Sequence, residues 1–268
     1  PFEDVKKVQE IAKATGYKSI SHDLVFGLPK QRMTDIIDTV EKTLTLRPDR
    51  IALYSYAHVP WIKGNGQRGY DESDLPQDSE KRALYEKAKG LLEAEGYIEI
   101  GMDHFALPHD DLAKAFIAKG LHRNFMGYTT QNTDFLLGLG MSSISDSWFG
   151  FAQNEKSTEK YMEIVNSGII PIFRGHLLND LDLEIRKYIL DLMCHFETEF
   201  TNNPSSIKLQ SAIKSRLSGM IEDGLVKIEG NKVTVTEAGI PFVRNCCMAF
   251  DQDLADKEQQ QNMFSKTI

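Results

Sequence analysis

Hydrophobic and polar residues alternate with two different periods along the first part of the chain. Apolar positions three or four residues apart predict helices, and short runs of β-branched and aromatic residues bounded by glycine or proline predict strands. The predicted helices span 3–15, 33–46 and 79–95. The predicted strands span 18–26, 50–58 and 97–105, with a long polar loop at 60–78. Strands and helices that alternate in this way favour a parallel sheet built from βαβ units.

The second part of the chain has a different pattern. Residues 120–153 combine polar, aromatic and glycine-rich strings, and the residues that follow are mostly helical in period. The predicted helices there span 155–167, 180–197, 205–223 and 240–264. A β-hairpin is predicted at 224–236, with its turn at Gly230-Asn231. Helices followed by such a hairpin are typical of a winged-helix-like module, and the few basic residues in it favour a packing role over DNA binding.

These elements predict an α/β fold in which part of a β/α barrel is followed by a mostly helical domain with a winged-helix-like hairpin. The expected boundary divides residues 1–150 from residues 151–268. Because three parallel strands are too few for a sheet covered on both faces, we expect the sheet to be incomplete.

Composition narrows the class of protein. Of the 268 residues, 41% are hydrophobic and 26% are charged, which is ordinary for a globular protein. The net charge of −8 disfavours nucleic-acid binding through bulk charge, and no long apolar run predicts a membrane span. The three cysteines, Cys194, Cys246 and Cys247, have no CxxC spacing. We therefore expect a reduced, cytoplasmic protein in which these cysteines are buried and hold no metal.

Polar side chains gather where the predicted strands end, which is where ligands bind to parallel sheets. Asp23 precedes the apolar run Leu24-Val25-Phe26, and a buried carboxylate there needs a ligand hydroxyl or ammonium group, or a structural salt bridge. Arg123 can pair with a ligand carboxylate through its planar guanidinium, or anchor a loop on backbone carbonyls. Asp103 and His104 are adjacent on a predicted strand, so their side chains should point to opposite faces and form no dyad.

Several distinctive strings occur along nearly the whole chain: Asp23-Leu24-Val25-Phe26-Gly27-Leu28-Pro29, Tyr56-Ala57-His58, Gly101-Met102-Asp103-His104-Phe105, Leu121-His122-Arg123-Asn124-Phe125, Gly127-Tyr128-Thr129-Thr130-Gln131 and Arg244-Asn245. In this order they resemble the oxygen-independent coproporphyrinogen III oxidases, a family of radical S-adenosylmethionine enzymes.

The resemblance implies a fold and an activity. The family oxidatively decarboxylates two propionates of coproporphyrinogen III to vinyl groups, which gives protoporphyrinogen IX in haem biosynthesis. A 4Fe–4S cluster and S-adenosylmethionine, of which the family holds two molecules per enzyme, supply the radical that removes a hydrogen atom from the propionate. The chain would then be the C-terminal part of a radical S-adenosylmethionine barrel with its helical domain, and an electron donor is a further expected partner.

The resemblance also implies roles for single residues. Asp23, Ala57 and Ile144 match family positions that contact S-adenosylmethionine, and we expect Arg123 and Lys30 to bind carboxylates of the substrate. No catalytic residue is assigned. The family's CxxxCxxC cluster motif is absent from the chain, so the cluster would be bound elsewhere and the chain alone is expected to be inactive. Met126 stands where the family has a glutamine.

A haem-binding chaperone from a related branch of the radical S-adenosylmethionine proteins is the alternative function. Two strings, Gly101-Met102-Asp103-His104-Phe105 and Thr129-Thr130-Gln131, favour the oxidase over the chaperone. A winged-helix DNA-binding protein is a third alternative.

Overall fold

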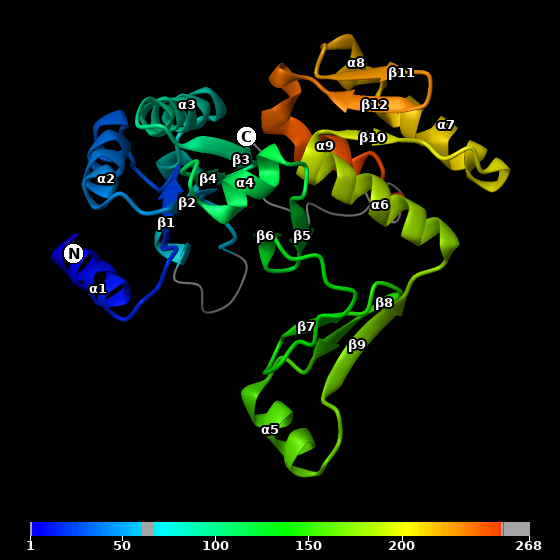
Figure 1. The fold of residues 1–268 in the computed structure, drawn as a ribbon, viewed down its shortest axis with the longest axis horizontal. Helices are drawn as coiled ribbons and strands as arrows, with labels where there is room; N and C mark the ends of the chain where they lie inside the picture. The colour runs from blue at the N-terminus through cyan, green and yellow to red at the C-terminus, as the bar shows by residue number, and fades with distance from the viewer. Residues whose placement is uncertain (1, 61–66, 253, 255–268) are drawn as a thin grey trace.

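The structure, a computed structural model, describes residues 2–60, 67–252 and 254 (Figure 1). An α/β layer forms the N-terminal end, a helical module with a small sheet forms the C-terminal end, and a second sheet with its own helix projects away from both. The mixed α/β class expected from the sequence is confirmed.

A four-stranded sheet forms the N-terminal layer. Its spatial order is β1 (Ser21–Phe26), β2 (Arg50–Ser55), β4 (His104–Ala106) and β3 (Ile98–Gly101). Helices α2 (Met33–Leu46) and α3 (Asp78–Ala94) pack on one face, where Ile36, Val40 and Leu92 join the strand residues Phe26 and Ile51 in one buried core. Helix α1 (Phe2–Ala14) lies beside α2, and the Gln9 side chain donates to the Leu46 carbonyl at 2.6 Å.

The expectation of a third parallel strand over 97–105 is wrong. Strand β1 pairs with β2 in parallel, but β2 pairs antiparallel with β4, and β4 pairs antiparallel with β3. The chain reverses at Gly101 and Met102, whose φ angles of 155° and 51° lie in the region that glycine tolerates best. The glycine is also needed because a Cβ at position 101 would lie 2.7 Å from the Tyr128 hydroxyl.

Short elements connect the two ends of the molecule. After α4 (Asp111–Ile117), strands β5 (His122–Asn124) and β6 (Gly127–Thr129) form a hairpin. The projecting sheet follows, with β7 (Ile144–Asp146), β8 (Gly150–Asn154) and β9 (Ile172–Leu177) in sequence order and α5 (Thr158–Asn166) at its tip (Figure 1).

The C-terminal module has its own core around α6 (Asp180–His195) and α9 (Val243–Met248). Strands β10 (Glu197–Glu199), β12 (Lys232–Val235) and β11 (Val226–Glu229) form its sheet, and α7 (Ile207–Arg216) and α8 (Ser218–Glu222) precede the β11–β12 hairpin. The predicted hairpin and its turn at Gly230-Asn231 are confirmed. The predicted helix over 240–264 begins with a 3₁₀ turn, Glu237–Phe242, before α9, and residue 253 and those from 255 onward lie outside the described residues.

Two further expectations concern the chain as a whole. All three cysteines are free and buried, which confirms their packing role. In the part of the chain that the structure describes, no helix has both the length and the apolar content of a membrane-crossing segment.

Candidate functional site

On the face of the N-terminal sheet opposite α2 and α3, helix α4 packs only against the β3–β4 end, and the rest of this face presents polar side chains. Side chains alternate along strands, so the residues that register with Ala52 and Tyr54 share the face opposite the α2–α3 core. Asp23 pairs in register with Ala52, Val25 pairs with Tyr54, and His104 pairs with Ala52 from the other side. This face, which we call the open face, therefore collects an acid, a phenol and an imidazole from three adjacent strands.

Asp103 and His104 form a dyad, contrary to expectation. Because the chain turns at Met102, Asp103 lies in the turn and its Oδ1 accepts from His104 Nδ1 at 2.5 Å. The His104 ring also meets Tyr54 and Tyr128 edge-on, with ring centroids 6.2 and 5.4 Å apart. Adjacent residues point to opposite faces only within a regular strand, and a tight turn removes that constraint.

Asp23 is exposed, whereas its apolar sequence context predicted a buried carboxylate. The side chain is exposed on the open face, whereas Leu24 and Phe26 on the other face of β1 pack toward the helices. It makes no hydrogen bond or ion pair with another described residue, so a structural salt bridge is not what holds it. The Asp23 carboxylate also affects Tyr54. The pKa of the Tyr54 phenol is raised mainly by burial and further by the negative charges of Asp23 and Asp103.

Ala57 and Ile144 lie on separate parts of the fold. Ala57 follows the carboxyl end of β2, and its carbonyl accepts from the Gln67 amide at 3.0 Å. Ile144 begins β7 in the projecting sheet, and Gly138 approaches its backbone so closely that a Cβ there would lie 2.7 Å away. Asp23 thus lies within β1, in register with Ala52 of β2, whereas Ala57 lies beyond the carboxyl end of β2, and Ile144 comes from another sheet.

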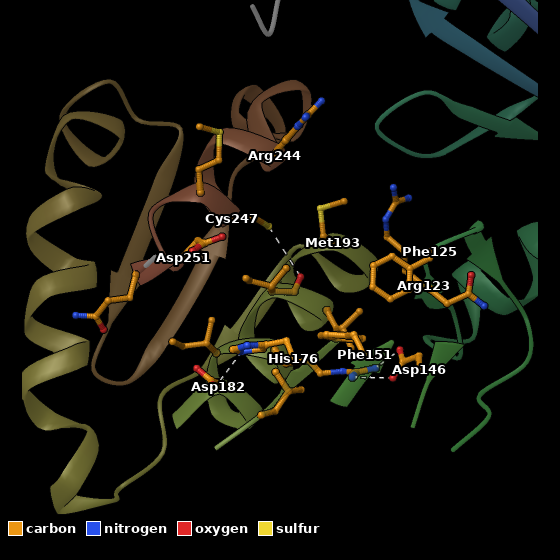
Figure 2. A pocket seen from close by; sticks show the side chains of 18 residues that line it. Arg123, Phe125, Asp146, Phe151, His176, Asp182, Met193, Arg244, Cys247 and Asp251 are labelled. Atoms are coloured by element: carbon orange, nitrogen blue, oxygen red, sulfur yellow. Dashed lines mark hydrogen bonds and ion pairs between the residues drawn. The ribbon is translucent and has the colours of Figure 1, made fainter. Parts of the chain in front are cut away.

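A cavity of about 510 Å³ lies where the β5–β6 hairpin, the projecting sheet, α6 and α9 meet (Figure 2). All of these elements contribute to its apolar wall, the hairpin through Phe125 in its turn. The wall residues are Phe125, Phe151, Leu178, Ile185, Ile189, Leu190, Met193, Cys247 and Met248. Arginines enter it from three elements, Arg123 from β5, Arg186 from α6 and Arg244 from α9.

The structure separates the two cations that the sequence nominated. Arg123 lines this cavity, but Lys30 lines a second one of about 440 Å³ beside α3, where its Nζ lies 3.2 Å from Asp74. Arg123 stacks on the Tyr128 ring, with 4.7 Å between the guanidinium carbon and the ring centroid. Its buried Nη1 has no hydrogen-bond partner, so the expected alternative of a loop anchored on backbone carbonyls is not what the structure shows.

Sequence reasoning missed the other two arginines of the cavity. Arg186 makes a two-pronged pair with Asp146, at 2.9 and 2.6 Å, and its guanidinium lies between the rings of Trp148 and Phe151. Arg244 is exposed and makes no ion pair with a described residue. The string Arg244-Asn245 was the one available signal, and it lies far from Arg123 in the sequence.

Burial controls the titration of the groups beside the cavity. Burial and the nearby Arg186 charge lower the pKa of His122, so the ring is neutral at pH 7. Burial raises the pKa of the Cys194 and Cys246 thiols to about 12 and also raises that of Cys247. Metal ligation requires the thiolate, and burial disfavours the charged thiolate at all three positions. Among the described residues, no group of three His, Cys, Asp or Glu side chains is arranged to hold a metal ion.

Comparisons with known proteins agree on one family. The chain is 35% identical over 271 aligned positions to the oxygen-independent coproporphyrinogen III oxidase of Pseudomonas aeruginosa, covering 99% of this chain and 58% of that protein. The oxidases of Synechocystis and Escherichia coli are 37% and 36% identical, over 98% and 96% of this chain and 58% and 57% of their own lengths. No family model matches.

A solved structure gives the same result. The coproporphyrinogen III oxidase of Escherichia coli, described as a radical SAM enzyme, superimposes with a TM-score of 0.88 at 34% identity. The match covers 94% of this chain and 59% of that one. The chain thus spans less than two thirds of the length of the relatives that it matches.

Proposed function

Because the chain is a homologue of the oxygen-independent coproporphyrinogen III oxidases over nearly its whole length, we propose that it forms part of such an enzyme. The reaction would convert two propionates of coproporphyrinogen III to vinyl groups. The observation that carries the proposal is the open face of the sheet, on which the family string beginning at Asp23 places an exposed, unpaired carboxylate. The named relatives are oxidases, which favours this function over the haem-binding chaperone.

The residues of the open face fit S-adenosylmethionine. Asp23 is a free acceptor that can bind ribose hydroxyls or the ammonium group, since it has no partner among the described residues. Ala57 and Ile144 offer small and apolar contacts of the kind that an adenine face takes, and the family holds two such cofactor molecules. When bound, the cofactor and an iron–sulfur cluster supply the one-electron chemistry that removes a hydrogen atom from a propionate.

The chain's own residues do not fit the cluster. An iron–sulfur cluster needs several thiolates close together, and the three buried thiols have raised pKa values. We therefore place the cluster on a region outside this chain and route no step of the reaction through Cys194, Cys246 or Cys247. An external electron donor would complete the reaction.

The test is an anaerobic assay of the full-length enzyme with coproporphyrinogen III, S-adenosylmethionine and a reductant. We expect two CO₂ per substrate and protoporphyrinogen IX as product, with the wild type and a Lys42→Gln surface variant equally active. Stable retention of haem with no release of CO₂ would contradict the proposal and favour the chaperone. The assay also measures the cofactor consumed per vinyl group formed, which bears on how many molecules are held.

A further inference from the structure

The cavity between the β5–β6 hairpin, α6 and α9 is lined by three arginines and three acids, and two of the arginines have no acid partner in the described part of the chain. Its three acids are all engaged. Asp146 pairs with Arg186, Asp182 accepts from the Asn179 amide at 3.0 Å and lies near His176, and Asp251 accepts from the Leu254 amide at 2.9 Å. Arg123 and Arg244 have no ion-pair partner in the described part of the chain.

The unpaired arginines differ in burial, and the difference is informative. Arg244 is exposed, so water can satisfy its guanidinium. Arg123 Nη1 is buried without an acceptor, and a buried charged donor in that state destabilises a fold unless a ligand supplies the acceptor. A planar guanidinium donates most favourably to a carboxylate or another flat anion.

Apart from Asn124, His176 and Gln252, the remainder of the cavity is apolar. Phe125 and Phe151 meet edge-on with ring centroids 5.1 Å apart, and Ile189 and Met193 of α6 continue the wall. In the view of Figure 2, the guanidinium groups of Arg123 and Arg244 lie above Phe125 and Phe151, and Asp146 lies below Phe125. A ligand that fits must therefore combine a large apolar body with carboxylates at its edge.

We propose that this cavity is the porphyrinogen site, in which propionates pair with Arg123 and Arg244 and the macrocycle lies on the apolar wall. The proposal rests on the proposed function and extends it by assigning the substrate to a cavity and to a second arginine. The carboxylate of S-adenosylmethionine is the other available source of this chemistry. It fits less well, since that molecule carries a sulfonium cation and neither Asp23, Ala57 nor Ile144 lines the cavity.

The location relative to the cofactor residues supports the same assignment. Ile144 and Asp146 are two residues apart on β7, so their side chains point to the same face of the strand. Asp146 lines the cavity, and Ile144 is the proposed cofactor contact. The Tyr128 ring contacts both regions: the Arg123 guanidinium of the cavity stacks on it, and the His104 ring of the open face meets it edge-on. The cavity and the open face are therefore joined through Tyr128, and β7 carries both a cavity residue and a proposed cofactor contact.

The test is direct binding of coproporphyrin III, the air-stable oxidised form of the substrate, to the 268-residue chain, followed by fluorescence anisotropy. Its tetramethyl ester has the same macrocycle without charge. We expect the tetracarboxylate to bind at least tenfold more tightly than the ester. Arg123→Gln and Arg244→Gln should each weaken tetracarboxylate binding by about tenfold or more and leave ester binding unchanged, since a charge-assisted hydrogen bond is lost.

Matched variants separate specific from general effects. Lys42→Gln removes one positive charge from α2, far in sequence from the cavity, and should change nothing. Arg123→Lys keeps the charge but loses the planar donor pair, so its affinity should fall between wild type and Arg123→Gln. Because Arg244 is exposed, its variant will fold even if the Arg123 variants do not. Excess S-adenosylmethionine should not displace the porphyrin.

Three outcomes would overturn the proposal: no binding by the wild type, equal affinity for acid and ester, or unchanged binding by Arg244→Gln. Competition by S-adenosylmethionine would assign the cavity to the cofactor and would also overturn it. The proposed function is judged separately by CO₂ release from the full-length enzyme. Turnover with a KM unaffected by Arg244→Gln would contradict the proposed substrate site and support the proposed function. Binding of the porphyrin that depends on the arginines, without turnover by the full-length enzyme, would support the site and contradict the function.

Discussion

At the scale of single residues, the site contains charged side chains that form ion pairs and charged side chains that form none with a described residue. Asp146 and Arg186 satisfy each other, with side chains only 11% and 13% exposed. Asp23, Arg123 and Arg244 have no such partner among the described residues. The first group holds the cavity together, and the second is available to ligands. The two groups therefore predict opposite consequences for substitution.

Asp23→Asn should weaken S-adenosylmethionine binding by the full-length enzyme and leave the fold intact. The carboxylate is exposed and bonds to no described residue, so its loss removes only a charge-assisted contact to the ligand, worth about 1.5–3 kcal/mol. Calorimetric titration gives the affinity, and thermal unfolding checks the fold. Asp38→Asn, on the exposed face of α2, is the control. An affinity equal to wild type would remove Asp23 from the site.

Asp146→Asn should instead destabilise the chain by about 3–5 kcal/mol, because it leaves Arg186 as an uncompensated, largely buried charge. The Trp148 amide would also lose a charged acceptor, since it donates to Asp146 Oδ1 at 2.9 Å. Urea unfolding measures the change in the free energy of unfolding. A loss below about 1 kcal/mol would show that the aromatic rings around Arg186 hold this region without the carboxylate.

At the scale of elements, sequence patterns predicted most helices, the hairpin and the parallel pair of strands, but not the other two strands of the N-terminal sheet. Apolar periodicity predicted both ends of the helix at 33–46 correctly. The pair Gly230-Asn231 predicted the turn of the β11–β12 hairpin. The third strand failed because a single left-handed residue, Met102, converts one apolar run into two antiparallel strands. The site was predictable only in part for a similar reason. Arg123 stood in a distinctive string, whereas Arg244 reaches the cavity through the packing of α9 on α6.

One ion-pair network joins three elements and should depend on pH. Glu197 of β10 accepts from Lys232 of β12 at 2.8 Å and from Lys119, just after α4, at 2.9 Å. The Lys232 and Lys119 hydrogen bonds lower the pKa of Glu197 from 4.5 to about 2. Because the pKa of Glu197 is lower in the folded chain than in the unfolded chain, its ionised form stabilises the fold when the pH is above 4.5. This stabilisation is lost as the pH falls from 4.5 toward 2.

Glu197→Gln should therefore lower the free energy of unfolding at pH 7 by up to about 1 kcal/mol, since solvent screens the network. The difference from wild type should shrink below pH 4.5 and disappear near pH 2. Chemical unfolding across this pH range measures it. Glu199→Gln, on the same strand and exposed, is the control. A difference that is independent of pH would show that the side chain acts by packing and not by charge.

At the scale of the whole molecule, we propose that the chain contributes ligand-binding surfaces and that the cluster is bound outside it. We expect it to be catalytically silent by itself, because its three thiols are buried and protonated. Anaerobic reconstitution with iron and sulfide should leave no brown charge-transfer absorbance and no 5′-deoxyadenosine above a protein-free blank. The full-length enzyme, treated identically, is the positive control. Cluster uptake by the chain would show that the chemistry has been misplaced.

The three buried cores have a consequence for the time course of folding. The core under α2 and α3 uses residues from 24 to 107, and the core of the C-terminal module uses mainly residues from 181 to 250, so each lies mainly within one part of the chain. The third core joins Tyr128 to Cys194, and the Tyr128 hydroxyl donates to the Met193 carbonyl at 2.9 Å. Because this core needs residues from both parts of the chain, we expect it to form after the other two cores. Weakening it should accelerate unfolding and leave the refolding rate nearly unchanged.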